Sequence, residues 1–312
     1  MWRMTGARLL QAVPLLFIIT AVTFVLQLFI PGDAARSIGG ISAPPDQVEA
    51  LRQRLHLDDP VWVQYWHWLK GAVHGDLGSA ITNGESVTAS LNTRVAVTLS
   101  VVVSATLLSL VIGLVLGVTS ARGRRAVAGA ADVAALAGMT VPAFWLGLIG
   151  IWLFNTRLGW FPANGYTFFR DSPSRWALSL VLPVSALAFN GITVVAKVSR
   201  EQLVDVMNRE FVRNLRANGV SERRILLRHA LRHVLIPVLT VCGNNLIGML
   251  GAAVVIEELF GLPGLGSLAV TATASSDIPV IQGVAVYFTL IVISINLLLD
   301  LVVGWINPQV ST

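Results

Sequence analysis

The chain has 312 residues, of which 54% are hydrophobic and only 12% are charged, and its mean hydropathy is +0.72. Because soluble domains carry about 25% charged residues, this composition excludes a soluble globular enzyme, a disordered regulator and a nucleic-acid-binding module. The single cysteine, Cys242, excludes an intramolecular disulfide and a cysteine-rich metal site. The composition therefore predicts an all-α, polytopic membrane protein.

Six uncharged apolar runs are long enough to cross a hydrocarbon core about 30 Å thick. They comprise residues 9–30, 95–118, 133–154, 176–196, 234–256 and 280–299. The first run follows Arg3 and Arg8, as the core of a signal peptide would, but it exceeds the roughly 7–15 residues of such a core. No small-residue cleavage pattern follows it. We therefore predict six transmembrane helices in a single domain, residues 1–312.

The distribution of basic residues predicts the orientation of these helices. Of the 22 lysines and arginines, 14 lie in the N-terminus and in segments 118–133 and 197–233, against eight in the opposite connections. Connections rich in Lys and Arg face the cytoplasm. Both termini are therefore predicted to be cytoplasmic, and the net charge of +5 reflects topology rather than nucleic-acid binding.

The first connection, residues 31–94, is predicted to be a long external loop. Val48, Leu51 and Leu55 recur at helical spacing within residues 46–57. An aromatic cluster follows, made up of Trp62, Tyr65, Trp66 and Trp68. Aromatic rings with polar edges favour the membrane interface. The segment is expected either to lie on the outer membrane surface or to contact an external partner protein.

The connection of residues 197–233 is predicted to be a cytoplasmic helix–break–helix. Its apolar residues at a spacing of three or four indicate one amphipathic helix; they are Leu203, Val204, Met207, Phe211 and Leu215. Asn218-Gly219 supplies a stop, because glycine readily adopts the left-handed conformation that ends a helix. Ser221 is expected to cap a second helix that continues into the fifth span. Such a loop would either transmit a push from a cytoplasmic partner or lie as an unpartnered surface helix.

The strings in this loop carry a family resemblance. Residues 200–219 (REQLVDVMNREFVRNLRANG), followed by VSERR and HALRHVLIP, resemble the EAA loop of ABC importer permeases. The closest variant is that of the dipeptide/oligopeptide/nickel permease family. Further strings similar to this family are Pro31-Gly-Asp33, Gly75-Asp-Leu-Gly78, Pro142-Ala-Phe-Trp145, residues 257–266, Asp277-Ile-Pro279, Gln282-Gly283 and residues 296–300. Their order over nearly the whole chain resembles the B-type subunit.

The resemblance implies a type I ABC importer permease of the bacterial plasma (inner) membrane that forms half of a translocation pathway. Its implied partners are a second homologous permease subunit, one or two ABC ATPase subunits and an extracytoplasmic solute-binding protein. The loop is implied to dock on the ATPase through Glu210, Phe211, Arg213, Arg216, Ala217, Gly219, Val220, Glu222 and Arg223. The implied cargo is a dipeptide or oligopeptide, with nickel, opines or glutathione as alternatives.

The chain carries no catalytic motif of its own. A phosphate-binding P-loop needs Gly-Lys-Ser/Thr, whereas the only lysines, Lys70 and Lys197, follow Leu69 and Ala196. ATP and magnesium are therefore expected on partner subunits, with no cofactor in this chain. His229 and His233 share one helix face, but the neighbouring Arg228 and Arg232 would repel a metal cation, so no metal site is predicted.

Two other groups of polar residues are candidate sites. Asn190, Asn244, Asn245 and Asn296 fall within the predicted spans, where unpartnered polar groups are costly. They are expected either to line a pathway or to make interhelical hydrogen bonds. Glu257, Glu258, Pro263 and Gly264 follow the fifth span. They are expected to form an outer gate, a contact for the binding protein, or a capped loop at the membrane edge.

Two other function classes make different demands on the sequence. A secondary transporter that works alone predicts inverted repeats with broken helices, and no convincing repeat is visible. An intramembrane enzyme needs a nucleophile beside a base, yet no histidine falls within a predicted span. The sequence therefore favours an ATP-driven permease subunit over both.

Overall fold

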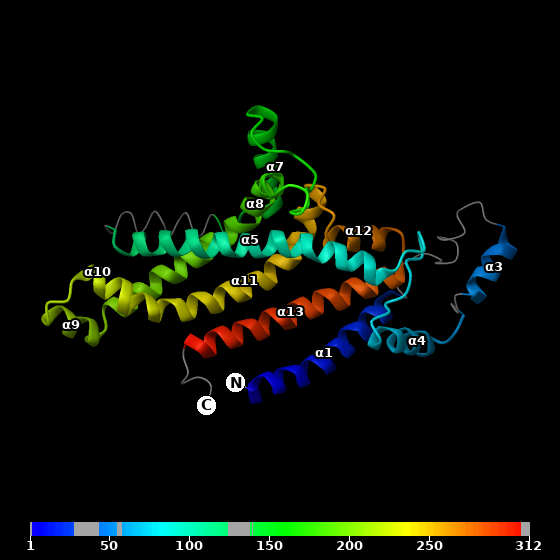
Figure 1. Ribbon diagram of the computed structural model, residues 1–312, viewed down its shortest axis with the longest axis horizontal. Coiled ribbons are helices and arrows are strands. Elements are labelled where there is room, and N and C mark those ends of the chain that lie inside the picture. Colours follow the sequence, from blue (N-terminus) through cyan, green and yellow to red (C-terminus); the bar gives the residue numbers. More distant parts are fainter. Residues whose placement is uncertain (1, 28–43, 55–57, 124–137, 139, 307–312) are drawn as a thin grey trace. The chain divides into compact units, whose positions relative to one another are not determined.

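The computed structural model describes residues 2–27, 44–54, 58–123, 138 and 140–306, and their named elements are all helices (Figure 1). The helices are α1 (Trp2–Gln27), α3 (Pro45–Arg54), α4 (Val61–Val73), α5 (Val87–Ala121), α7 (Ala143–Gly150), π-helix η1 (Ile151–Arg157), α8 (Pro173–Met207), α9 (Glu210–Ala217), α10 (Glu222–Arg224), π-helix η2 (Ile225–Ala230), α11 (Leu231–Leu259), α12 (Leu265–Ala274) and α13 (Ile278–Ile306). The predicted all-α class is confirmed for this part of the chain.

Four helices within the described residues are long and apolar enough to cross a membrane. They are Val87–Ala121, Pro173–Met207, Glu222–Leu259 and Ile278–Gly304, and they contain the second, fourth, fifth and sixth predicted spans. The first and third predicted spans run partly through residues outside the described ranges. Their described parts form a shorter apolar helix, Ala12–Leu26, and the α7–η1 segment. The count of six spans stays a prediction.

The chain divides into two compact units. Unit 1 contains residues 99–262 and 295–312, and unit 2 contains residues 2–98 and 263–294. Helices α5 and α13 contribute residues to both units. The predicted cytoplasmic loop falls in unit 1. The described part of the predicted external loop falls in unit 2.

In unit 2, α4 packs against α1 through its aromatic side chains. The Tyr65 hydroxyl lies 2.9 Å from the Thr20 hydroxyl, and the Tyr65 ring is 5.8 Å from Phe17 and 5.5 Å from Phe24 between centroids. Trp62 on the same helix is exposed. The predicted aromatic cluster is therefore divided between a packed face and an open face. Of the predicted amphipathic stretch, Pro45–Arg54 is helical with Val48 buried, and Leu55 lies outside the described residues.

Polar residues from two of the family-like strings hold unit 2 together. Buried Gln282 donates a hydrogen bond from its amide nitrogen to the Thr20 carbonyl oxygen over 2.7 Å. Buried Asp277 accepts hydrogen bonds from the Thr82 backbone N–H and hydroxyl group, at 3.1 and 3.0 Å. A buried polar group is costly unless it is hydrogen-bonded. These two side chains therefore have a structural role in the fold.

In unit 1, α8 and α11 lie side by side, and α7 packs against both (Figure 1). Ser109, Gly113 and Gly117 recur every four residues on α5 and face α8. A Cβ atom on Gly113 would lie 2.6 Å from the Val195 Cβ, and the Ser109 hydroxyl lies 3.0 Å from the Ala188 carbonyl oxygen. Small residues allow membrane helices to approach closely, so this stripe sets the separation of α5 and α8.

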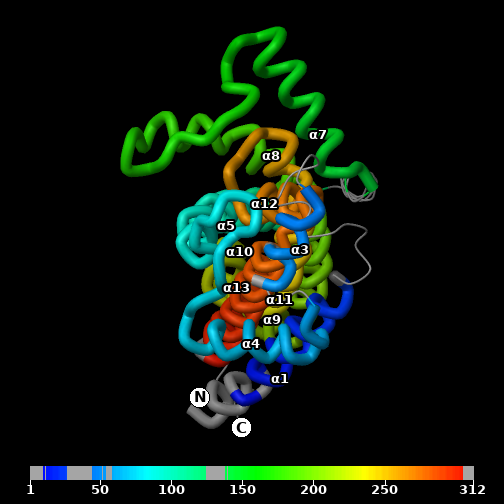
Figure 2. Tube along the Cα trace, turned by 90° about the vertical axis from the view of Figure 1, so that its right-hand side faces the viewer, coloured from blue at the N-terminus to red at the C-terminus, as the bar shows by residue number. Residues whose placement is uncertain are grey.

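The segment from η1 to α8 extends away from the α8–α11 pair, as Figure 2 shows in green. Hydrogen bonds hold it at two neighbouring residues, Gly165 and Tyr166. The Trp176 indole nitrogen donates to the Tyr166 hydroxyl over 2.9 Å, and the Gly165 backbone N–H donates to the Phe260 carbonyl oxygen over 3.0 Å. The second of these bonds fixes the segment to the end of α11.

We expect Gly117→Ala to destabilise the protein, because the added Cβ would lie 2.5 Å from the Ser199 Cβ and 2.6 Å from the Ala196 carbonyl oxygen. Overpacking of this kind costs on the order of 1–3 kcal/mol. Thermal unfolding in detergent should show a lower midpoint. Gly304→Ala is the control, since its Cβ would have no neighbour within 4 Å among the described residues. Equal midpoints for the two variants would contradict the proposed packing.

Candidate functional site

The predicted cytoplasmic loop begins on a long helix. Helix α8 runs past the end of the fourth predicted span and stops at Met207, and Arg209 then has an extended backbone with φ −70° and ψ 153° before α9 begins. The prediction of one amphipathic helix over residues 203–215 is therefore wrong. The residue that follows the helix, Asn208, still has its backbone in the right-handed helical region, and the chain leaves that region at Arg209. The apolar spacing continues across the break because the residues on both sides pack on one core.

Helix α9 is anchored on its inner face. Val212 is fully buried, and the Phe211 ring lies 5.5 Å from the His233 ring between centroids. Phe211 also packs against a buried cluster from α8, η2 and α11 that includes Leu203 and Val234. The short helix is therefore held against the helices that precede and follow it.

Gly219 ends α9 in a Schellman motif. Its φ is +74°, a conformation that glycine adopts without steric cost. The Gly219 N–H donates to the Arg216 carbonyl oxygen and the Val220 N–H donates to the Leu215 carbonyl oxygen, both over 3.0 Å. The predicted stop at this glycine is confirmed. Ser221 occupies the N-cap position of α10, but its side chain makes no capping hydrogen bond.

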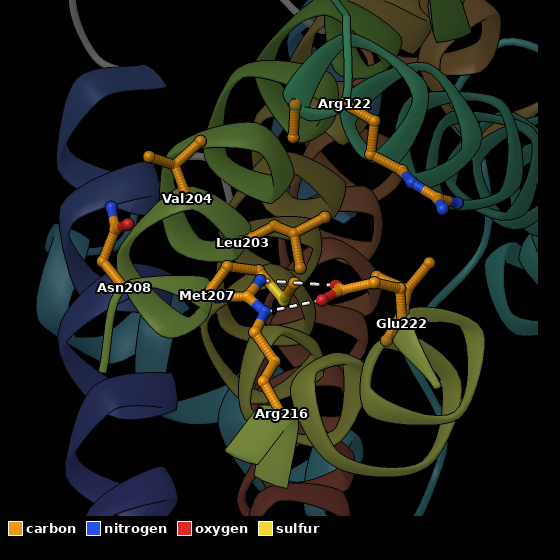
Figure 3. A pocket seen from close by; sticks show the side chains of 9 residues that line it. Arg122, Leu203, Val204, Met207, Asn208, Arg216 and Glu222 are labelled. Carbon is orange, nitrogen blue, oxygen red and sulfur yellow. Dashed lines mark hydrogen bonds and ion pairs between the residues drawn. The ribbon is translucent and has the colours of Figure 1, made fainter. Parts of the chain in front are cut away.

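An ion pair closes the turn between α9 and α10. The Arg216 Nε and Nη2 atoms donate to the two Glu222 carboxylate oxygens, over 2.5 and 3.3 Å (Figure 3). Glu222 precedes the fifth predicted span, and this hydrogen bond lowers the pKa of its carboxyl below the ordinary value. Both groups are exposed. The bidentate geometry fixes the direction of the chain where it reverses.

A third charged group, Arg122, comes from the end of α5. Its charge also lowers the pKa of the Glu222 carboxyl. It lines a cavity of about 260 Å³ beside the ion pair (Figure 3). The remaining lining residues come from the ends of α5, α8, α9 and η2 and from α10; they are Ala121, Leu203, Val204, Met207, Asn208, Arg216, Glu222 and Leu226. The loop is thus built where the ends of four helices, α5, α8, α9 and η2, meet α10.

The nine predicted docking residues divide into two sets. Seven are exposed: Glu210, Arg213, Arg216, Ala217, Gly219, Glu222 and Arg223. Phe211 and Val220 are partly buried, and Phe211 anchors α9 inward. Sequence reasoning missed Arg122, because nothing in its own segment signals proximity to Glu222, and it missed the contact between His233 and Phe211. No local pattern predicts either pairing.

The four predicted outer residues fall in both units. Glu257, at the end of α11, is fully buried, and its backbone carbonyl accepts a hydrogen bond from the Leu262 N–H over 2.8 Å. Glu258 is exposed. Pro263 is partly buried and Gly264 is buried, and both belong to unit 2. The accessible acid in this group is Glu258.

The structure brings two of the four asparagines together. Asn190 on α8 and Asn245 on α11 line one cavity of about 350 Å³. Asn244 is exposed, and Asn296 on α13 is partly buried. Neither is part of the cavity lining. Helical spacing explains the separation of Asn244 from Asn245, since consecutive residues on a helix point in different directions.

Comparison with known proteins assigns the chain to a family. The family "Binding-protein-dependent transport system inner membrane component" matches residues 109–312, and the corresponding N-terminal family matches residues 1–103. A protein of Brucella abortus (strain 2308) that is named a peptide transport system permease is 38% identical over 304 residues, 97% of each chain. The glutathione transport system permease protein GsiC of Escherichia coli (strain K12) is 35% identical over 304 residues, again 97% of each chain.

Both the matched ranges and the described helices agree with a multi-pass permease. The chain belongs to the family of inner-membrane components of binding-protein-dependent transport systems, the permeases of ABC importers.

Proposed function

We propose that this chain is a permease subunit of an ATP-driven importer for dipeptides and oligopeptides. The relative named a peptide transport permease supports this cargo class, because its similarity extends over 97% of both chains. We place the chain in the bacterial inner membrane with both termini cytoplasmic, as its basic residues indicate. A second homologous permease, one or two ABC ATPase subunits and a solute-binding protein complete the importer, and the ATPase subunits hold ATP and magnesium.

The observation that supports the proposal is the packing of the loop between α8 and α11 against the two helices that it connects. Helix α8 enters the loop without interruption, and Glu222–Leu259 leaves it as one continuous helix. Helix α9 is tied by the Phe211–His233 contact at one end and the Arg216–Glu222 ion pair at the other. A displacement of α9 by an ATPase would therefore move two membrane helices together.

The exposed face of the loop is the proposed docking surface. Glu210, Arg213, Ala217 and Arg223 are exposed on or beside α9, whereas Val212 faces the core. These charged side chains suit a polar interface with the ATPase subunit. The small side chain of Ala217 would let the ATPase subunit approach α9 closely. In this proposal the buried face of α9 packs against the membrane helices, and its charged face contacts the ATPase subunit.

Glutathione is the second candidate cargo, supported by the 35% identical relative GsiC. A different candidate function is a secondary transporter, which would work without ATPase subunits.

One uptake experiment distinguishes these candidates. Proteoliposomes with the complete importer should accumulate labelled trialanine only when ATP, the ATPase subunits and the binding protein are present. Glutathione uptake without trialanine uptake would select the second candidate. Uptake by this chain alone, driven by an ion gradient, would refute the proposal.

We expect Gly219→Val to uncouple ATP hydrolysis from uptake, because a β-branched residue at φ +74° is strained. The readout is the amount of peptide imported per ATP hydrolysed in proteoliposomes, which should fall several-fold. Gly219→Asn is the matched control, since asparagine tolerates the left-handed region, and it should retain most of the coupling. Normal coupling in the valine variant would argue against a rigid loop.

We expect Glu222→Gln to loosen the turn between α9 and α10, because it removes the charged partner of Arg216. Limited trypsin digestion reports this, since the loop presents exposed Arg213 and Arg223 as cleavage sites. Cleavage should be faster than in the wild-type protein. The control is Glu210→Gln, which changes an exposed glutamate at the start of α9. Identical digestion of the two variants would show that the ion pair does not order the loop.

A further inference from the structure

The cavity lined by Asn190 and Asn245 lies within unit 1, apart from the loop. Its walls come from three segments: residues 140–143 before and at the start of α7, α8, and α11. Its volume of about 350 Å³ lies at the lower end of the range of roughly 300–1,000 Å³ for small-molecule sites. This size suits a short stretch of a ligand rather than a long peptide.

The chemistry of the lining is neutral. Among the described residues that line the cavity none carries a charge, and their polar side chains are those of Thr140, Asn190 and Asn245. A carboxamide offers both a hydrogen-bond donor and an acceptor. Two carboxamides from different helices complement a ligand group that also has both a donor and an acceptor, such as the N–H and C=O of a peptide unit. An ionised group would find no counter-charge among these described residues.

Asn245 has an unused donor. Its Nδ2 atom is buried, and no hydrogen-bond partner lies within the described part of the chain. A buried polar group without a partner is costly, and such an exception in a native structure calls for an explanation. A ligand carbonyl in the cavity would satisfy this donor.

Two glycines shape the cavity in different ways. Gly191 fixes the wall, because an added Cβ would lie 2.5 Å from the Ser109 hydroxyl and 2.6 Å from the Met249 methyl carbon. Gly248 leaves the lining open, since its Cβ would meet nothing within 4 Å among the described residues. The space beside Asn245 is therefore bounded by closely packed helices. At Gly248 no side chain fills it.

We propose that this cavity binds one uncharged peptide unit of the cargo, with Asn245 donating to its carbonyl oxygen and Asn190 supplying the second amide. The inference rests on the proposed peptide import and deepens it. A site that binds the peptide unit through two carboxamides, and whose described lining has no charge for side chains or termini, makes passage through this chain independent of the peptide's sequence. Selection among peptides then falls to another component.

The experiment uses the complete importer in proteoliposomes, in a Cys242→Ala background that removes the only cysteine of this chain. Gly248→Cys places a thiol in the cavity lining, and N-ethylmaleimide modifies it. Trialanine with its binding protein and ATP should slow this modification several-fold. Gly251→Cys is the matched control, one turn further along α11 and outside the lining, and its modification should not change.

A second pair of variants tests the asparagine. Adding Asn245→Leu should abolish the protection by trialanine, whereas Asn244→Leu, on the adjacent exposed residue, should leave it intact. The inference would be overturned if the unmodified importer takes up trialanine but protection is absent at position 248. Equal protection at positions 248 and 251 would overturn it as well. Absence of uptake by the unmodified importer would instead refute the proposed function.

Discussion

The close approach of α5 to α8 is the constraint on which the rest of unit 1 depends. Lipid tails are as apolar as leucine side chains, so membrane helices associate through close packing and hydrogen bonds. Ser109, Gly113 and Gly117 supply both on α5, with contacts to Ala188, Val195 and Ser199 on α8. The same helix pair supports the loop at one end, through Arg122 and Leu203, and it forms a wall of the asparagine cavity further along, through Gly191.

Helical continuity connects these two regions. Asn190 and Leu203 belong to the same uninterrupted α8, and Asn245 belongs to the helix that begins beside Glu222. A rigid helix transmits a displacement along its axis, so a movement of the loop reaches the cavity without an intermediate hinge in α8. The break at Asn208 lies beyond the buried Val206. It therefore separates α9 from α8 and leaves α8 itself intact.

The sequence predicted those features that a local pattern of residues determines. Apolar length predicted the four long spans, and glycine chemistry predicted the end of α9 at Gly219. It failed at Asn208, because apolar spacing is the same on both sides of a break when both helices pack on one core. It could not bring Arg122 to Glu222 or Phe211 to His233, since these pairings arise from tertiary packing. Of the four intramembrane asparagines, composition could not separate Asn190 and Asn245 from Asn244 and Asn296.

We propose that the loop of residues 197–233 meets an ATPase subunit at α9. Site-directed crosslinking from Ala217→Cys, an exposed position on that helix, tests it most directly in the complete importer. We expect a crosslink to the ATPase subunit, with a yield that changes between the nucleotide-free and ATP-bound states. A thiol at this position that is modified only by impermeant reagent from outside the cell, with no crosslink to the ATPase, would contradict it.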